Sequence, residues 1–290
     1  MPTGLPRSCV RDGVLVFIHI NKTAGRTVRY ILRSSYGLRH CEVEPWHDAW
    51  GGPPFSTRDL RRLRKIYPKL RSIAGHRVTG YADLEEQGTD FRYFAFLREP
   101  VALCASRFQY QIDYRKKNVE FDDWIADESF QNAQTKQLGG TESVDDALRT
   151  IEEKKIFVGL TEQFDESLLL LKGLRAGDLD IAYKPVNVAH RNALASEVLA
   201  SPRMRSAIVE ANSSDLALYE YITQELYPAQ RREYGASLPE DVARYQADRE
   251  RDFNRRKLTA SRAKQYLVYK PLLALYRKTG GRGTAGKAPA

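Results

Sequence analysis

The chain has 290 residues, enough for one large α/β domain or two small ones. Hydrophobic residues make up 42% and charged residues 29%, which predicts a globular protein with a buried core. The formal net charge is +9, but residues 249–290 hold 12 Lys or Arg against 2 acids, and the rest of the chain holds 34 against 35. Because the excess charge is confined to the end of the chain, the net charge does not indicate that the fold as a whole binds polyanions. No base-reading motif supports nucleic-acid binding.

The cysteines and the apolar runs indicate the compartment. Three widely spaced cysteines form neither a disulfide framework nor a CxxC metal site, which favours a reducing compartment. The first residues contain no apolar run typical of a secretory signal. The first long apolar run, residues 14–20, is interrupted by His19 and is too short to span a membrane. We therefore expect a cytoplasmic protein, with the inner face of the membrane as an alternative location.

Strand-like and helix-like segments alternate in the first half of the chain. Buried strands are predicted at Val14–Ile20, Leu70–Gly75, Phe91–Leu97 and Ile156–Leu160. Helices are predicted at Thr27–Ser35, at Val101–Lys116 and through Leu168–Lys172, the last with Thr161 as its N-cap. This order predicts an α/β fold with a central parallel sheet, whose ligands bind at the carboxyl ends of the strands.

The second half of the chain is expected to be mostly helical, from about residue 189 to residue 278. We predict one catalytic domain over residues 1–235 and a basic helical extension over residues 236–278. The small polar residues 279–290 are expected to be a disordered tail.

The loop after the first predicted strand, residues 21–27, has the features of an anion site. A strand-to-helix junction offers unpaired backbone N–H groups and the positive end of a helix dipole. Ala24 and Gly25 allow close approach of a phosphate, Lys22 supplies a cation, and Thr23 and Thr27 supply hydroxyl donors. The alternative is an ordinary lysine-containing turn that leads into a helix. The loop lacks the GxxxxGK[ST] pattern and no magnesium ligands lie nearby, which disfavours an ATPase or kinase.

The segment VFIHINKTAGRT, residues 16–27, resembles the 5′-phosphosulfate loop of carbohydrate sulfotransferases, especially the heparan sulfate 2-O and 6-O type and their bacterial relatives. The segment AFLREPV, residues 95–101, with Ser106 beyond it, is similar to the family's 3′-phosphate-binding element. Two later blocks, NAQTKQLGG from Asn132 and FVGLTEQFDESL from Phe157, follow in the family's order. The resemblance covers roughly residues 14–222.

This resemblance implies a P-loop-like three-layer fold and a transferase that uses 3′-phosphoadenosine 5′-phosphosulfate (PAPS) as sulfuryl donor, without a metal. Lys22 would contact the leaving phosphate, and Arg98 and Ser106 would hold the 3′-phosphate, a task that suits a bidentate guanidinium. The remaining donor-binding residues implied are Thr23, Ala24, Gly25, Arg26 and Thr27.

The catalytic base implied by the resemblance is His76, which follows the second predicted strand in the sequence AGHR. An imidazole with an ordinary pKa of about 6.5 suits proton removal from a hydroxyl. The alternative is a structural histidine at a strand end. Glu99 is a weaker candidate base, because its place beside the phosphate-binding arginine favours a structural role. His19 is expected in the core or behind the site.

The implied acceptor is a glycan or glycolipid, as in polysaccharide modification, and no nucleic acid is expected. Arg77, Arg107 and Lys136 are candidate acceptor contacts. A loop with Trp46 and Trp50, flanked by His40 and His47, either lines the acceptor groove or packs on itself.

Several positions depart from the family pattern. Asn21 stands where Pro or Gln is commoner, Glu99 where Asp is usual, and Leu103 where many members have Arg. Arg26 replaces a small hydroxyl residue and so removes one donor from the phosphate loop. This last change keeps open the alternative of a catalytically inactive glycan- or partner-binding member, and a nucleotide-dependent kinase is a further alternative.

The basic end of the chain combines cations with apolar residues at helical spacing, with Pro271 as a predicted kink. One interpretation is peripheral contact with an anionic membrane through this helix. The other is a terminal helix that packs on the body with its cations in solvent.

Overall fold

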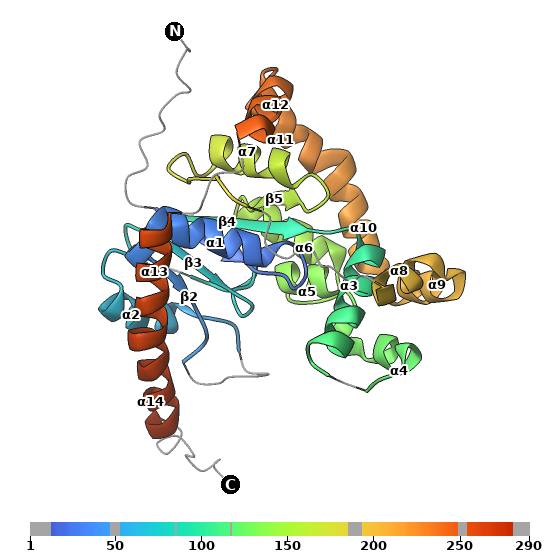
Figure 1. Cartoon of the computed structure of the whole chain (residues 1–290), viewed down its shortest axis with the longest axis horizontal. Helices are drawn as coiled ribbons and strands as arrows, with labels where there is room; N and C mark the ends of the chain where they lie inside the picture. Colours follow the sequence, from blue (N-terminus) through green and yellow to red (C-terminus); the bar gives the residue numbers. More distant parts are fainter. Residues whose placement is uncertain are drawn as a thin grey trace.

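The computed structural model describes residues 13–46, 53–84, 86–116, 118–184, 193–248 and 254–280. Its centre is a five-stranded parallel sheet in the order β2-β3-β1-β4-β5 (Figure 1). The strands are β1 (Val14–Ile18), β2 (His40–Glu42), β3 (Ser72–Gly75), β4 (Phe91–Leu97) and β5 (Phe157–Leu160). The predicted α/β class with a central parallel sheet is therefore confirmed.

The central strand β1 places three strand ends side by side. Ile18 of β1 pairs with Gly75 of β3 on one side and with Ala95 of β4 on the other. All five residues of β1 are buried, as expected of an apolar strand covered on both faces. The residues that follow β3, β1 and β4 therefore meet at one edge of the sheet.

Helices surround the sheet and make up most of the later part of the chain. The helices before β5 are α1 (Gly25–Tyr36), α2 (Thr57–Ile66), α3 (Pro100–Asp113), α4 (Phe121–Ala126), α5 (Ala133–Gly139) and α6 (Val144–Glu153). Those after β5 are α7 (Phe164–Leu174), α8 (Ala193–Ala200), α9 (Pro202–Ala211), α10 (Ser213–Tyr221), α11 (Tyr227–Tyr234), α12 (Leu238–Asp248), α13 (Arg255–Lys264) and α14 (Lys270–Gly280). Short helical turns are η1 (Gly37–Arg39), η2 (Glu128–Phe130), η3 (Ile222–Leu226) and η4 (Gln265–Tyr269).

The helices lie on several sides of the sheet. In Figure 1, α13 and α14 form one rod beside α1, whereas α4, α8 and α9 lie at the far side of the molecule. The main core includes the sheet, α1, α7 and part of the rod. A second core joins α3 to α4, α8 and α9 through residues such as Phe108, Trp124 and Ile208. This second core anchors α3 away from the sheet.

Two π-helical turns accommodate prolines within otherwise continuous helices. The turn η3 ends two residues before Pro228, and η4 ends two residues before Pro271. Proline has no N–H for the usual helical bond, and its ring clashes with the preceding turn. A wider π turn relieves this clash, so the kink predicted at Pro271 is a local π turn.

The rod α13–η4–α14 covers the edge strand β2. The Gln265 side chain donates to the Glu42 carbonyl (2.6 Å) and accepts from the Glu42 N–H (3.1 Å). The Tyr269 hydroxyl accepts from the Glu44 N–H at 3.0 Å. These bonds satisfy backbone groups that an exposed edge strand would leave unpaired, so the rod packs on the body.

Some predicted boundaries were wrong. The first strand ends at Ile18 rather than Ile20, which places His19 just beyond it. The helix after it begins at Gly25, two residues early, and β2 was not predicted. Thr161 does not cap α7: its hydroxyl donates to the Leu97 carbonyl, and α7 begins three residues later. The last helix includes Thr279, which was assigned to the tail, and residues 281–290 lie outside the described residues.

Among the helices of the described residues, none combines the length and the apolar character needed to span a bilayer.

Candidate functional site

The loop between β1 and α1 presents an uncapped helix N-terminus. Ala24 is the N-cap of α1, in the left-handed conformation (φ 59°), and no side chain caps the helix. The first turn of α1 contains no acidic residue. The buried Thr23 hydroxyl donates to the Ile20 carbonyl (3.0 Å) and so holds the loop rather than the helix. The positive end of the α1 dipole is thus left for an anion.

Gly25, in this loop, packs directly against the imidazole of His19. A Cβ atom at Gly25 would lie 1.8 Å from Nε2 of His19. His19 is buried, and burial, followed by the charges of His76 and Arg29, lowers its pKa well below the ordinary value. The contact explains why the loop needs glycine at this position, since any side chain would displace the imidazole.

His76 stacks on His19 at the end of β3. The two ring centroids are 3.9 Å apart with an interplanar angle of 28°. Nδ1 of His76 lies 2.9 Å from the His19 carbonyl oxygen, which can only accept, so Nδ1 carries the hydrogen. The Nε2 lone pair of His76 is then available to accept a proton.

The surroundings of His76 favour its neutral form. Desolvation by the adjoining loops lowers the pKa of His76, and the Arg29 and Arg115 guanidiniums act in the same direction. The hydrogen bond to the His19 carbonyl and the carboxylate of Glu42 oppose this effect. His76 is nevertheless exposed as a residue, so a substrate hydroxyl could reach it.

Lys22 and Arg98 converge from adjacent strand ends. Nη1 of Arg98 donates to the Lys22 carbonyl at 3.3 Å, and Nζ of Lys22 lies 5.1 Å from the centroid of the Tyr110 ring. Burial, followed by the charges of Arg98 and Arg26, lowers the pKa of Lys22. Ser106 lies one turn before Tyr110 on α3, so the two face the same side of that helix. This group of cations and donors is suited to a multiply charged anion.

Glu99 caps α3. Its carboxylate accepts from the N–H groups of Val101 (3.0 Å) and Ala102 (2.7 Å). The carboxylate therefore serves the helix, which supports the structural alternative over a role as base.

Helix α5 forms hydrogen bonds to the backbone that follows β4 and to the backbone that follows β3. Gln134 is fully buried; its side chain accepts from the Arg98 N–H (2.9 Å) and donates to the Arg98 carbonyl (3.0 Å). Three residues later, Gln137 donates to the carbonyls of His76 (3.0 Å) and Val78 (2.7 Å). One short helix thus fixes the backbone at both Arg98 and His76.

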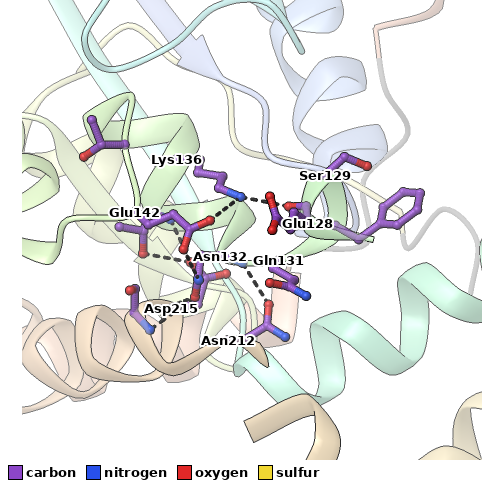
Figure 2. A network of polar contacts seen from close by, with 12 residues as sticks. Glu128, Ser129, Gln131, Asn132, Lys136, Glu142, Asn212 and Asp215 are labelled. Atoms are coloured by element: carbon purple, nitrogen blue, oxygen red, sulfur yellow. Dashed lines mark hydrogen bonds and ion pairs between the residues drawn. The ribbon is translucent and has the colours of Figure 1, made fainter. Parts of the chain in front are cut away.

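The start of α5 is itself fixed by a buried polar network (Figure 2). Asp215 accepts from the N–H groups of Gln134 (3.1 Å) and Thr135 (2.8 Å). Asn132 adopts the left-handed conformation (φ 47°), accepts from the Asp215 N–H at 3.2 Å and donates to Glu142. Since the network joins α5 to α10, it supplies rigid support behind the site.

Other candidate residues have structural partners. His40 is buried, where burial and the charges of Arg33 and Arg29 lower its pKa to about 3. Trp46 packs edge-on against Tyr269 and Tyr276 of the rod α13–η4–α14, a contact that neither interpretation of its loop predicted. His47, Trp50 and His190 lie outside the described residues.

The three candidate acceptor cations differ in their contacts. Arg107 donates to the Phe130 carbonyl (2.7 Å) and stacks on its ring. Lys136 pairs with Glu142 (2.6 Å) and donates to the Glu128 carbonyl, as Figure 2 shows. These two cations are therefore engaged in holding the fold, whereas Arg77 follows His76 directly and remains a candidate acceptor contact.

Within the described ranges, no group of three or more His, Cys, Asp or Glu side chains is arranged to hold a metal ion.

Comparison with known proteins agrees with the site. No protein-family model matches the chain. The mouse protein named galactose-3-O-sulfotransferase 3 is 28% identical over 239 residues, 71% of this chain and 54% of the mouse protein. The cattle protein of the same name is 29% identical over 241 residues, and the human protein 28% over 239. Over 71% of its length the chain is thus similar to curated carbohydrate sulfotransferases. It spans about half the length of the curated relatives that it matches.

The relatives refine the family resemblance without assigning roles to residues. The names of the relatives specify galactose. The resemblance to the heparan sulfate subgroup and to its bacterial members, inferred from the motifs, stays a prediction. The roles of Lys22, His76, Arg98 and Ser106 also stay predictions.

Sequence reasoning missed three residues that shape the site. Tyr110 faces Lys22, Gln134 holds Arg98, and Gln137 holds His76. The two glutamines lie in the block NAQTKQLGG, which was matched only as a block. Tyr110 could have been predicted, because it lies one helical turn after Ser106 and therefore on the same side of the helix.

Proposed function

We propose that the chain transfers a sulfuryl group from PAPS to a hydroxyl of a carbohydrate. The acceptor oxygen forms a bond to sulfur, the bond from sulfur to the phosphate oxygen breaks, and 3′-phosphoadenosine 5′-phosphate (PAP) leaves with that electron pair. The acceptor proton passes to Nε2 of His76. The observation that carries this proposal is the meeting of a neutral, oriented imidazole with a cationic, uncapped phosphate loop at one sheet edge.

Each residue acts on a charge that changes during transfer. Lys22 and the N-terminus of α1 stabilise the charge that develops on the leaving phosphate. Arg98 and Ser106 hold the 3′-phosphate and so orient the donor for in-line attack. Thr23, Ala24, Gly25, Arg26 and Thr27 form the loop around the 5′ end. Burial and neighbouring cations lower the pKa of Lys22, and a bound phosphate should raise it again, because the anion favours the protonated amine.

For the acceptor, we propose a glycan or glycolipid that carries galactose. The support is the name of the curated relatives, which specifies sulfate transfer to position 3 of galactose. Because the chain covers about half of each relative, the acceptor and the cytoplasmic location remain proposals.

The donor site can be tested by thermal unfolding with PAP, ADP and ATP-Mg. A ligand at 100 times its dissociation constant stabilises the native state by about 2.7 kcal/mol, which raises the midpoint by several degrees. We expect a large shift with PAP, a smaller one with ADP, and no PAP shift for Lys22→Ala. The control Lys65→Ala changes an exposed lysine on α2 and should respond like wild type. A shift with ATP-Mg alone would support a kinase, and no shift with any nucleotide would support a member that does not bind the donor.

The base can be tested by sulfate transfer from PAPS to galactose-terminated and heparan-type oligosaccharides. For His76→Ala we expect a loss of about 10²- to 10⁴-fold in turnover, the range typical of a general base, with PAP binding retained. Near-normal turnover in this variant would disprove the base assignment. Transfer only to the heparan-type acceptor would reject galactose and leave the reaction class intact.

A further inference from the structure

The rod α13–η4–α14 has one face buried on the body. Gln265, Tyr269 and Leu273 are at most 2% exposed, and they recur every four residues along the rod. The rod is therefore held in one rotational setting, because these side chains fill the region beside β2 and α1. Its opposite face is fixed toward solvent for the same reason.

That outward face carries an unusual concentration of large apolar side chains. Eleven large hydrophobic residues are exposed among the described residues, and five of them lie in one ten-residue segment of the rod, residues 266–275. Leu267 is 76% exposed, and Tyr266 and Leu275 are each 58% exposed. The five, which we name the outer stripe, are Tyr266, Leu267, Val268, Leu272 and Leu275. Exposed apolar side chains scattered singly need no explanation, but five of them within ten residues of one helix indicate an interaction surface.

The charge of the rod restricts what the outer stripe can meet. Residues 255–280 contain eight Lys or Arg and no Asp or Glu. The eight are Arg255, Arg256, Lys257, Arg262, Lys264, Lys270, Arg277 and Lys278. Lys270 and Arg277 pair with Glu44 of the body. Lys257, Arg262 and Lys264 donate to neutral oxygens of the body, which leaves their charges unbalanced. The sequence adds Arg282 and Lys287 beyond the rod. A partner must therefore offer negative charge around an apolar zone.

A second copy of the chain does not meet this requirement. In a two-fold dimer the same patch faces itself, so two acid-free cationic rods would lie against each other. The surface of an anionic lipid bilayer meets it directly, because phosphate groups lie above an apolar layer. A tyrosine such as Tyr266 also suits the boundary between headgroups and acyl chains.

We propose that the rod α13–η4–α14 is a peripheral membrane-binding helix. The outer stripe enters the boundary between headgroups and acyl chains, and the surrounding cations contact lipid phosphates. The rod lies in the plane of the bilayer and does not cross it, consistent with its length and charge. This proposal does not depend on the sulfuryl-transfer proposal, because none of the donor-site residues lies on the rod.

The proposal can be tested by co-sedimentation of the full chain with vesicles. We expect binding to phosphatidylcholine vesicles that contain phosphatidylserine, weak binding to vesicles of phosphatidylcholine alone, and loss of binding as salt is raised. The double variant Leu267→Glu with Leu275→Glu should lower the partition coefficient at least about tenfold, since two apolar groups are replaced by anions. Both positions are exposed, so the unfolding midpoint should stay that of wild type.

A matched control places the same substitutions on another exposed surface. Leu199→Glu with Val209→Glu changes exposed apolar residues on α8 and α9, far from the rod in Figure 1, and should leave binding unchanged. Equal binding to both kinds of vesicle, or unchanged binding by the Leu267 and Leu275 variant, would overturn the proposal. Absence of vesicle binding together with dimers that the same variant disperses would overturn it in favour of self-association.

Discussion

Two strand-to-helix junctions lie next to each other in this fold and treat their helix ends in opposite ways. Where β1 meets α1, the N-cap is Ala24, no side chain caps the helix, and the first turn has no acid. Where β4 meets α3, the Glu99 carboxylate accepts from two N–H groups of the first turn, and Pro100 lacks the third. One helix end is open, and the other is already neutralised.

The difference indicates two ways to bind phosphate at one sheet edge. The open end of α1 can offer backbone N–H groups and its dipole directly, with Lys22 beside it. The closed end of α3 can contribute only through side chains, namely Arg98 and Ser106. We therefore expect phosphate binding at the β1–α1 junction to depend on the shape of the backbone. Phosphate binding at the β4–α3 junction should depend on the groups that hold Arg98 in place. The predictions that follow test this division.

The largest effect should come from Gly25→Ala. The added methyl group would meet the His19 imidazole, so the loop, the His19–His76 stack or both must move. We expect a loss of stability of about 3 kcal/mol. We also expect loss of the PAP-dependent rise in unfolding midpoint. Both are measured in one thermal unfolding experiment.

The control is Gly177→Ala, where an added Cβ meets no atom within 4 Å. This variant should keep wild-type stability and the PAP shift. A Gly25→Ala protein that binds PAP normally would show that the junction does not depend on backbone shape.

The second effect in size concerns the support of Arg98. Gln134→Ala would leave the Arg98 N–H and carbonyl without their buried partner, at a cost of about 2 kcal/mol in stability. We expect PAP affinity to fall about tenfold, because the guanidinium loses its fixed position. Calorimetric titration with PAP measures this directly.

Gln137→Ala is the matched comparison, since the same helix then loses its bonds to the His76 and Val78 carbonyls. Here turnover should fall while PAP affinity is kept. If both variants lowered PAP affinity equally, the separate support of the two strand ends would be refuted.

A third effect is the pH dependence of turnover. Desolvation lowers the pKa of His76, so the neutral base persists to a lower pH than a free imidazole would allow. Because the base must be unprotonated, kcat/KM should rise with pH and reach half of its plateau below pH 6.5. Glu99→Gln should not move this midpoint, since Glu99 is not among the groups that shift the pKa of His76. A midpoint at or above the ordinary histidine value would contradict the assignment.

The sequence predicted the parts of this arrangement that rest on local pattern. The apolar strands and the loop of residues 21–27 were visible because their composition alone distinguishes them. The three-residue strand β2 was missed, since His40, Cys41 and Glu42 show no apolar run and pair only through tertiary packing. Thr161 was assigned as a cap because its hydroxyl can serve either a helix or a strand end, and sequence does not say which.

The supports of the site could not be predicted for a different reason. Asp215 lies about 80 residues from the N–H groups that it accepts from, and His19 meets Gly25 only because a tight turn brings them together. Such contacts depend on the three-dimensional path of the chain and leave no local pattern. The family resemblance located the block around Gln134 but gave no role to its glutamines.

The smallest effects should come from a pair of charge changes that make each junction resemble the other. Glu99→Gln removes the carboxylate that neutralises α3, so stability should fall by about 1 kcal/mol. PAP should bind slightly more tightly, because a negative charge near Arg98 is lost. Arg26→Glu places an acid in the first turn of α1, where the side chain is exposed, and stability should rise by about 0.5 kcal/mol.

For Arg26→Glu the affinity for PAP should fall, because the carboxylate competes with phosphate for the N-terminus of α1. The two variants are therefore expected to have opposite signs in both stability and affinity. Thermal unfolding with and without PAP measures all four values. If Arg26→Glu bound PAP as well as wild type, the open end of α1 would not be the phosphate site, and donor binding would rest on Lys22 and Arg98 alone.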